Sequence, residues 1–281
     1  MREKNLYYLI SDKVRTYNTH MGKIIAIANQ KGGVGKTTTA INLAATLAVL
    51  EKKILLIDAD PQANSTSGVG VKADQITITT YDCLTEGTDP KLGIIKTNTP
   101  NLSILPSSID LVGAEIELVN ADGREYKMKN VLEGIKDEYD YIFIDCLPSL
   151  GLITLNALTA ADSILVPVQC EFFSLEGFGK LKDTINLVQQ SLNPNLAVEG
   201  VLLSMYDQRL RMANMVLEEI RHIISDRIYE TIIHRNSKIG EAPSLGQPVI
   251  IYDASSKGAI NFLNLANEFL SINENIPAFI K

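Results

Sequence analysis

The sequence predicts an α/β fold, with a doubly wound, mostly parallel sheet and helices on both faces, and three observations support this prediction. Short unbroken apolar runs recur along the chain, as is typical of strands buried in a parallel sheet. Segments with apolar residues at helical spacing lie between most of these runs. A glycine-rich turn joins the first run to the first helical segment. Repeated β-α-β units of this kind form a parallel sheet covered by helices.

The predicted strands begin at residue 24. The first covers residues 24–28, and the second covers residues 53–57 and ends on Asp58. The other strand candidates cover residues 102–105, 141–144, 163–168, 198–203 and 228–233. Helical patterns are clearest at residues 37–50, 212–224 and 256–271. Because ligands bind at the carboxyl ends of strands in such sheets, the residues that follow the strands are the first candidates for a site.

The chain is long enough for one large domain. It has 281 residues, 46% of them hydrophobic, and no Pro/Gly/Ser linker that would divide it, so we expect a single domain over residues 21–275. Residues 1–20 carry charges and three tyrosines without a firm period, which predicts a poorly ordered or loosely docked extension. A partner-binding or membrane-surface helix stays open for that segment, and Met21 could be an alternative start. Residues 276–281 are expected to form a short tail.

Charge and cysteine content narrow the class of protein. The net charge of −7 gives no global attraction to DNA or to an anionic membrane, although a local basic patch could still form, above all in a dimer. Cys83, Cys146 and Cys170 are far apart and form no C-x-x-C pair, which argues against a disulfide framework or a zinc site. No apolar run is long enough to span a bilayer, and no signal peptide is visible. We therefore expect a cytoplasmic protein.

The turn after the first strand has the composition of a phosphate-binding loop. It leads directly into a helix and reads Lys31-Gly32-Gly33-Val34-Gly35-Lys36-Thr37-Thr38. The glycines allow backbone N–H groups to turn inward around phosphate oxygens, and the helix N-terminus adds further donors. Lys36 can reach the β- and γ-phosphates, the Thr37 hydroxyl can ligate Mg²⁺, and Thr38 is placed for the α-phosphate. The predicted cofactors are ATP and Mg²⁺.

The loop departs from the standard G-x-x-x-x-G-K-[ST] signature. Gln30 stands where that signature has its first glycine, and a second lysine, Lys31, lies five residues before Lys36. One lysine is enough to neutralise phosphate charge within a subunit. The extra lysine at the mouth of the loop could contact a nucleotide held by a neighbouring copy of the chain.

This motif resembles that of the ParA/MinD family of deviant Walker ATPases, and the resemblance extends over most of residues 21–270. Several further segments resemble the chromosome-partitioning ParA/Soj branch: residues 58–62, 147–151, 167–169, 175–177 and 241–244. The resemblance implies that Lys31 reaches across a nucleotide-sandwich homodimer. It also implies that Lys31, Lys36 and Asp60 form the catalytic set, with Asp60 orienting the attacking water.

Two carboxylates are the candidate metal ligands beside Thr37. Asp145 follows a run of four apolar strand residues, which suits a Mg²⁺ shell, although an aspartate in this position often caps a helix or turn instead. The resemblance places Asp58 in or near the same Mg²⁺ environment. For adenine, the family pattern I-P-R-N reads Ile233-His234-Arg235-Asn236 here. Asn236 matches, whereas His234 replaces the proline whose backbone carbonyl contacts the base in the family. A backbone carbonyl contact does not need a proline ring, so we expect His234 and Asn236 to form an adenine site with altered loop geometry.

The expected function is an ATP-dependent dimerisation switch that binds duplex DNA without sequence preference and drives chromosome or plasmid segregation. The resemblance implies slow hydrolysis that a ParB-like centromere-binding partner stimulates, and a nucleoid-associated state when ATP is bound. The DNA-binding candidates are Arg209, Arg235 and Lys238, and the alternative for each is a place on a solvated charged face.

Other readings of the same scaffold stay open. A positioning or regulatory ATPase for conjugation, a capsule or another cargo is hard to separate from a partitioning protein. A MinD-like membrane switch would carry a basic amphipathic C-terminal helix, and the tail has one basic residue and a proline, so no stable membrane association is expected. The cysteines do not suit an iron–sulfur reductase, and we find no signal for the acceptor site of a synthetase.

Overall fold

The structure is a computed structural model of the chain, and it describes residues 22–170, 174–207, 209, 214, 215, 218, 220 and 226–274. Its centre is a seven-stranded sheet with the strand order β3-β4-β2-β5-β1-β6-β7. The strands are β1 (Lys23–Ile27), β2 (Ile54–Ala59), β3 (Ile95–Lys96), β4 (Leu102–Leu105), β5 (Tyr141–Cys146), β6 (Ser163–Gln169) and β7 (Ala197–Ser204). All neighbours pair in parallel except β3, which is a short antiparallel edge strand. The predicted doubly wound, mostly parallel sheet is confirmed.

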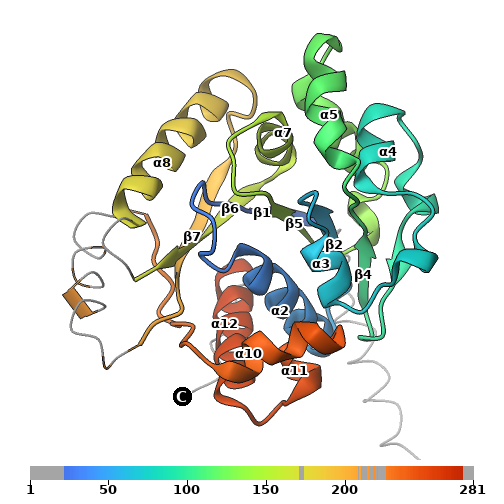
Figure 1. The fold of residues 1–281 in the computed structure, drawn as a ribbon. Helices are drawn as coiled ribbons and strands as arrows, with labels where there is room; N and C mark the ends of the chain where they lie inside the picture. The colour runs from blue at the N-terminus through green and yellow to red at the C-terminus, as the bar shows by residue number, and fades with distance from the viewer. Residues whose placement is uncertain are drawn as a thin grey trace, which may run out of the picture.

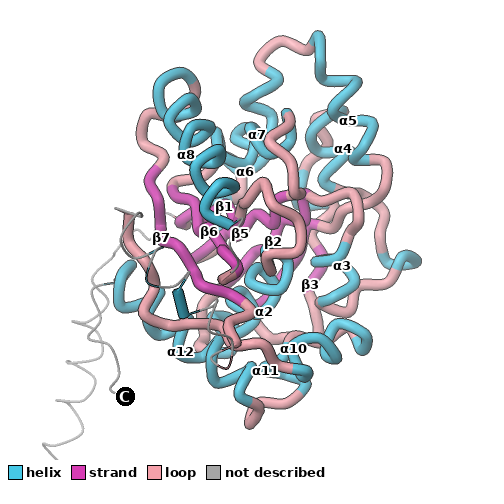
Figure 2. Tube along the Cα trace, turned by 60° about the vertical axis from the view of Figure 1, so that its left-hand side comes forward, coloured by secondary structure: helices cyan, strands magenta, loops and turns pink. Residues whose placement is uncertain are grey.

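Helices cover both faces of the sheet, as Figures 1 and 2 show. One face carries α4 (Thr80–Thr85), α5 (Leu111–Glu117), α6 (Lys127–Glu133), α7 (Leu152–Ala160) and α8 (Ser174–Ser191). The other carries α2 (Lys36–Val49), α11 (Val249–Tyr252) and α12 (Lys257–Glu274). The short helices α3 (Asn64–Gly68) and α10 (Ser237–Glu241) lie near the carboxyl edge, and six 3₁₀ turns complete the described elements: η1 (Ala73–Gln75), η2 (Pro90–Leu92), η3 (Leu118–Asn120), η4 (Arg124–Tyr126), η5 (Lys136–Glu138) and η6 (Ala242–Leu245).

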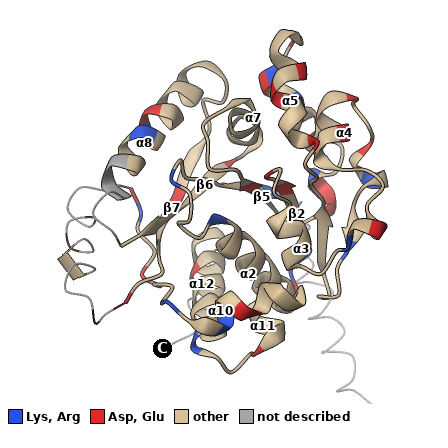
Figure 3. Cartoon of the chain, viewed as in Figure 1, with Lys and Arg blue, Asp and Glu red and all other residues tan. Residues whose placement is uncertain are grey.

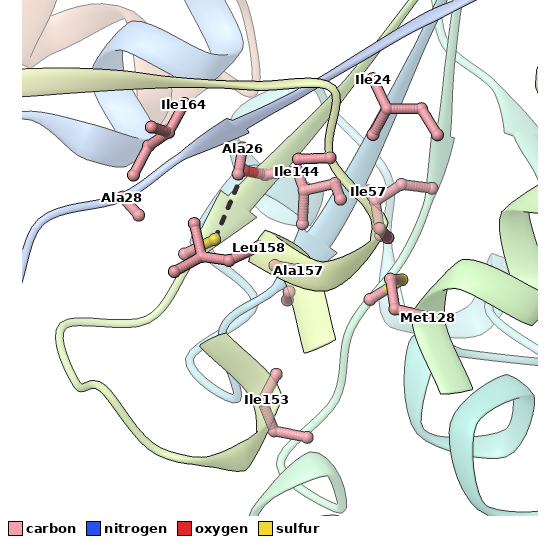
Figure 4. Packing of buried hydrophobic residues seen from close by; sticks show 14 of the residues in the cluster. Ile24, Ala26, Ala28, Ile57, Met128, Ile144, Ile153, Ala157, Leu158 and Ile164 are labelled. Atoms are coloured by element: carbon pink, nitrogen blue, oxygen red, sulfur yellow. Dashed lines mark hydrogen bonds between the residues drawn. The ribbon is translucent and has the colours of Figure 1, made fainter. Parts of the chain in front are cut away.

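Two apolar cores form because successive residues of each strand point to opposite faces of the sheet. Along β1, Ile24 and Ala26 belong to the core under α4–α8, whereas Ile25 and Ile27 belong to the core under α2 and α12. Figure 4 shows the first of these cores, in which side chains from strands and from α7 meet Met128 of α6. Strands buried on both faces explain the unbroken apolar runs in the sequence.

The predicted strand at residues 228–233 is wrong. That segment runs beside β7 and forms backbone hydrogen bonds with it near its two ends, but its pairing is limited to two isolated bridges, Val201 to Ile228 and Tyr206 to His234. Between these points the backbone N–H groups of Glu230 and Thr231 donate to the Glu268 carboxylate of α12, at 2.7 and 2.9 Å. These donors are taken by a side chain, and no regular ladder forms between the two bridges. The apolar pattern correctly predicted burial but not sheet pairing.

The remaining predicted elements have mixed outcomes. The helix expected at residues 256–271 is present as α12. The helix expected at residues 212–224 lies mostly outside the described residues, as do the extension at residues 1–20 and the tail at residues 276–281. Cys83, Cys146 and Cys170 are buried and free. No helix among the described residues is long and apolar enough to cross a membrane.

Candidate functional site

The carboxyl ends of β1, β2 and β5 meet at a cleft of about 560 Å³. These three strands are adjacent in the sheet, so the segments that leave them converge on one edge. The cleft is lined by five of the eight residues of the predicted phosphate loop and, among the predicted carboxylates, by Asp60 alone. Its lining residues are Gly33, Gly35, Lys36, Thr37, Thr38, Asp60, Pro61, Gln62, Asn64, Leu147, Pro148 and Met205.

The glycine loop has the backbone geometry that a phosphate cradle needs. Gly33 and Gly35 have φ of 73° and 88°, the left-handed region that side chains disfavour. Gly35 is also the N-cap of α2 and provides no capping side chain, so the first N–H groups of that helix have no side-chain acceptor there. The Ser204 hydroxyl of β7 donates to the carbonyl oxygen of Val34 at 2.7 Å and holds the loop from below. The uncapped helix start is a ready anion site.

Lys36 is prepared for an anion by burial. Lys36 is 6% exposed, and its Nζ donates to the Lys31 carbonyl oxygen at 3.1 Å. Burial lowers the pKa of this ammonium group, while the nearby carboxylates of Asp145 and Asp60 act in the opposite direction. Burial removes the water that would otherwise stabilise the positive charge of Lys36. A phosphate oxygen bound in the cleft would stabilise that charge instead.

Lys31 begins the loop but is not among the residues that line the cleft. Its backbone N–H donates to Asn29 Oδ1 at 3.0 Å, and Asn29 Nδ2 in turn donates to the Pro167 carbonyl oxygen at 2.8 Å. A Cβ placed on Gly177 of α8 would lie 3.8 Å from Lys31 Cβ. The side chain therefore starts between the phosphate loop and α8, and it is half-buried in the single chain. Its contact with a second subunit stays a prediction.

The two strand-end aspartates lie side by side. Asp58 and Asp145 are register partners in the adjacent strands β2 and β5, and both are 0% exposed. Asp58 Oδ2 accepts from Thr66 N at 2.8 Å and from Thr66 Oγ1 at 2.7 Å, while Oδ1 accepts from Asp60 N at 3.2 Å. Burial raises the pKa of Asp58, and the Thr66 and Asp60 hydrogen bonds partly counter that rise. Asp58 thus fixes the start of α3 and the loop that carries Asp60.

Asp145 fits the ligand shell of a magnesium ion. Ser65 Oγ donates to its Oδ2 at 2.7 Å, whereas its buried Oδ1 has no hydrogen-bond partner among the described residues. Burial is the largest cause that raises the pKa of Asp145, and the negative charge of Asp58 raises it further. Hydrogen bonds from Ser65 and Thr37 lower the pKa in part. A divalent cation would satisfy the orphaned oxygen and remove the cost of the buried negative charge.

The donor set around Asp145 is typical of magnesium rather than of a protein-only metal cage. No group of three or more His, Cys, Asp or Glu among the described residues could hold a metal ion. Mg²⁺ commonly takes one or two protein oxygens and completes its shell with phosphate oxygens and water. Thr37, at the start of α2, and Asp145 would be the protein ligands. Asp58 stays a predicted ligand, although both of its oxygens already accept hydrogen bonds.

Asp60 lines the cleft beyond the end of β2. It is 8% exposed, and its Oδ1 accepts a hydrogen bond from Gln62 N at 2.9 Å. Its own backbone N–H is held by Asp58, so the carboxylate is positioned from two sides. Its place on the cleft wall is compatible with orienting a water molecule, which stays a prediction.

The predicted adenine contacts lie beside the cleft rather than in its lining. His234 pairs with Tyr206, next to the cleft residue Met205, and its backbone N–H donates to Asn261 Oδ1 at 3.2 Å. Asn236 caps α10 by accepting from Lys238 N at 2.9 Å. Both candidates are therefore near the carboxyl end of β7, and their contact with a base stays a prediction.

Among the predicted DNA-binding cations, Arg209 and Arg235 are exposed and Lys238 is half-buried, and two of the three have acidic neighbours. Arg209 Nη2 lies 2.6 Å from Asp207 Oδ2, and Lys238 Nζ lies 2.8 Å from Glu241 Oε2. Arg235 directly follows His234 in the chain, and its residue is exposed. Figure 3 shows both basic and acidic residues on and beside α10. Surface ion pairs are weak, so a phosphate could compete with either carboxylate.

Sequence reasoning missed the hydroxyl and amide groups that hold the site together. The groups concerned are Asn29, Ser65, Thr66 and Ser204. Ser65 and Thr66 follow Asp60 closely in the chain, so their proximity was a usable signal. Nothing in the sequence showed that Ser204, 170 residues after Val34, would reach the loop.

A glycine loop at an uncapped helix start, facing buried strand-end carboxylates, defines a P-loop nucleoside triphosphatase. Comparison with known proteins narrows this class. A family model described as an AAA domain matches residues 22–198. The sporulation initiation inhibitor protein Soj of Bacillus subtilis is 52% identical over 249 residues, which cover 88% of this chain and 98% of the relative.

A second relative, the chromosome partitioning protein ParA of Myxococcus xanthus, is 51% identical over 250 residues, with 89% of this chain and 88% of the relative covered. A crystal structure named cobyrinic acid a,c-diamide synthase from Mycobacterium smegmatis, with bound ADP and magnesium, has a TM-score of 0.80 at 34% identity, and covers 93% of this chain and 100% of that one. The chain belongs to the ParA/Soj family of chromosome-partitioning ATPases.

Proposed function

We propose that this chain is an ATP- and Mg²⁺-dependent dimerisation switch that binds duplex DNA without sequence preference and drives chromosome or plasmid segregation. It hydrolyses ATP slowly to ADP and phosphate, and a ParB-like centromere-binding partner stimulates this reaction. The ATP-bound homodimer is the nucleoid-associated state in the cytoplasm, and no stable membrane association is part of the cycle. The position of Lys31 is the observation that carries the proposal.

The two lysines of the loop have different surroundings. Lys36 is buried against the cleft and has Asp145 and Asp60 as charged neighbours. Lys31 does not line the cleft, and its Cβ lies near Gly177 of α8. Because Lys36 already provides a cation inside the subunit, Lys31 is the natural group to meet the phosphates of a nucleotide in an opposed copy. The exposed Gly32 and Pro148 at the same rim leave room for that approach.

Within each subunit the residues divide the work of hydrolysis. The backbone of the glycine loop and Lys36 bind the phosphates, and Thr37 and Asp145 would hold Mg²⁺, which neutralises charge on the β- and γ-phosphates. Asp60 orients the water from the cleft wall, where Asp58 and Gln62 fix its backbone and carboxylate. The proposed DNA surface has Arg209, Arg235 and Lys238 as its cations.

Dimerisation explains how an acidic chain could bind DNA. The net charge is −7, and the carboxylates of Asp207 and Glu241 partly neutralise the cationic surface of one subunit. Two subunits held together by ATP double the number of phosphate contacts, and affinity rises steeply with that number. ATP thus makes contacts in the dimer that the monomer lacks, and a switch requires such a difference between its two states.

A ParA-like ATPase that positions another cargo is the alternative, because the nucleotide site would be the same. The 34% identity to a structure named as a diamide synthase makes a synthetase a second alternative. The two partitioning relatives are more similar in sequence, at 52% and 51% identity. We therefore favour segregation.

The test compares the parent protein with Lys31→Ala. In sedimentation with duplex DNA, the parent should dimerise and bind DNA only with ATP and Mg²⁺, and added salt should weaken that binding. Lys31→Ala should bind ATP as a monomer and lose ATP-dependent DNA binding. Lys53→Ala, which removes an exposed lysine at the opposite edge of the sheet, is the matched control. If Lys31→Ala dimerises on ATP as well as the parent, its role across the subunits is wrong. If ATP does not alter the parent's DNA binding, segregation through a DNA-bound dimer is wrong.

A further inference from the structure

Helix α5, the turn before it and the turn η3 after it expose an apolar face. Ile109, Val112, Ile116 and Val119 are 65%, 53%, 75% and 49% exposed. They recur at intervals of three and four residues, so they form one stripe along the helix. We refer to these four residues as the α5 stripe. Single exposed apolar residues are ordinary, whereas a contiguous stripe of large ones marks an interaction site.

The α5 stripe is not needed to hold the helix in place. Leu111, Ala114 and Leu118 form the opposite face, and they are 0%, 0% and 3% exposed in the core. Figure 1 shows α5 at the outer edge of the fold, with α4 and α7 beside it. The helix is thus anchored by one face and presents the other to solvent.

Acidic residues flank the α5 stripe. The exposed Asp110 and Glu117 lie on one side of it by helical spacing, and the half-buried Glu115 lies on the other. Glu117 is fixed by the Tyr81 hydroxyl, which lies 3.0 Å from each of its carboxylate oxygens. Residues 109–126 contain five acidic residues and one basic residue, and Figure 3 shows acidic residues in red on α5. The surface combines an apolar centre with a negative rim.

We propose that the α5 stripe is the docking site for a basic amphipathic helix of a partner protein. An apolar face of such a helix would cover the stripe, and its lysines or arginines would meet the acidic rim. A second copy of this chain is a poor occupant, because a symmetric contact would bring the same acidic rims together. The proposal rests on the proposed function in one respect, since it gives the stimulating partner a place to bind.

The position of α5 connects this surface with the nucleotide cleft. A Cβ placed on Gly151, at the start of α7, would lie 2.2 Å from Glu115 Oε1, so the two residues are in close contact. That oxygen is buried and has no hydrogen-bond partner among the described residues. The loop that ends at Gly151 begins with Leu147 and Pro148, which line the cleft. A partner on the α5 stripe would therefore be linked to the cleft wall through the contact between Glu115 and Gly151.

The test uses a labelled helical peptide of about 18 residues, with leucines on one face and lysines on the other, and a counterpart with glutamate for lysine. Binding to the full-length chain is followed by fluorescence anisotropy without nucleotide or DNA. Ile116→Glu is compared with Leu187→Glu, which adds the same charge at a residue of α8 that is 59% exposed. Circular dichroism checks that both variants fold. Because neither ATP nor DNA is present, a negative result here is separate from failure of the proposed switch.

The basic peptide should bind the parent and Leu187→Glu with affinities within about twofold. It should bind Ile116→Glu at least about tenfold more weakly, a difference of about 1.4 kcal/mol. The acidic peptide should bind all three weakly. If the basic peptide bound only through general attraction to an acidic protein, it would bind Ile116→Glu more tightly than the parent, since this substitution adds negative charge. Equal or tighter binding to Ile116→Glu, equal binding of the acidic peptide, or no binding of the basic peptide to the parent would each overturn the proposal.

Discussion

The Thr66 hydroxyl joins two parts of the site through a single oxygen atom. Its Oγ1 donates to Asp58 Oδ2 at 2.7 Å and accepts from Ser107 N at 3.0 Å. Thr66 is 2% exposed and Asp58 is 0% exposed, so water cannot readily replace either bond. Thr66→Val removes the hydroxyl while keeping the volume of the side chain. It therefore isolates the hydrogen bonds from the packing.

The expected loss of stability follows from the two bonds. A hydrogen bond to a charged group contributes about 1.5–3 kcal/mol, and an unsatisfied buried N–H costs about 1–3 kcal/mol. These contributions overlap when Ser107 relaxes, so the free energy of unfolding should fall by about 3 kcal/mol. At about 2–4 °C per kcal/mol for a chain near this size, Tm should fall by about 6–12 °C. Because Asp58 holds the backbone of Asp60 at 3.2 Å, ATP turnover should fall more than ATP affinity.

Urea unfolding at pH 8 measures the change in stability, and calorimetry measures the change in Tm. Thr66→Ser should recover most of the loss, because it restores the hydroxyl. Ser67→Ala, at an exposed position of the same helix, should change the free energy of unfolding by less than about 0.5 kcal/mol. The reasoning is refuted if Thr66→Val is as stable as Ser67→Ala, or if Thr66→Ser is as unstable as Thr66→Val.

Two further predictions concern charged groups. Asp60→Ala should bind ATP and DNA but lose turnover in a phosphate-release assay, and loss of ATP binding would contradict its assignment. Lys23→Met should cost about 3–5 kcal/mol at pH 7, because it leaves the carboxylate of Glu199, whose side chain is 2% exposed, without its cation. Burial alone would raise the pKa of Glu199, but hydrogen bonds from Lys23, Ser163 and Asn273 bring it below its usual 4.5. That stability is present above pH 4.5 and is lost as pH falls through the lowered pKa, so urea unfolding should show the difference between Lys23→Met and the parent shrinking in acid. A difference that is constant with pH would exclude the ion pair as its cause.

Local sequence was enough for the central strands. The residues of β1, β2, β5 and β6 are buried on both faces, so each one forms an unbroken apolar run that needs no knowledge of its neighbours. The two-residue edge strand β3 has too little pattern to predict. At residues 228–233 the same apolar pattern misled, because Glu268, distant in sequence, takes the backbone donors of Glu230 and Thr231.

The sequence by itself determined the phosphate loop and the strand-end carboxylates, because both depend on short-range order. The glycines, Lys36 and Thr37 are consecutive, and Asp145 directly follows its apolar run. Only the tertiary structure decided which groups hold them. Ser65 reaches Asp145 at 2.7 Å and Ser204 reaches the Val34 carbonyl oxygen at 2.7 Å, across 80 and 170 residues. The physical reason is that a polar side chain has many possible partners along the chain, and packing of the sheet selects the one that it meets.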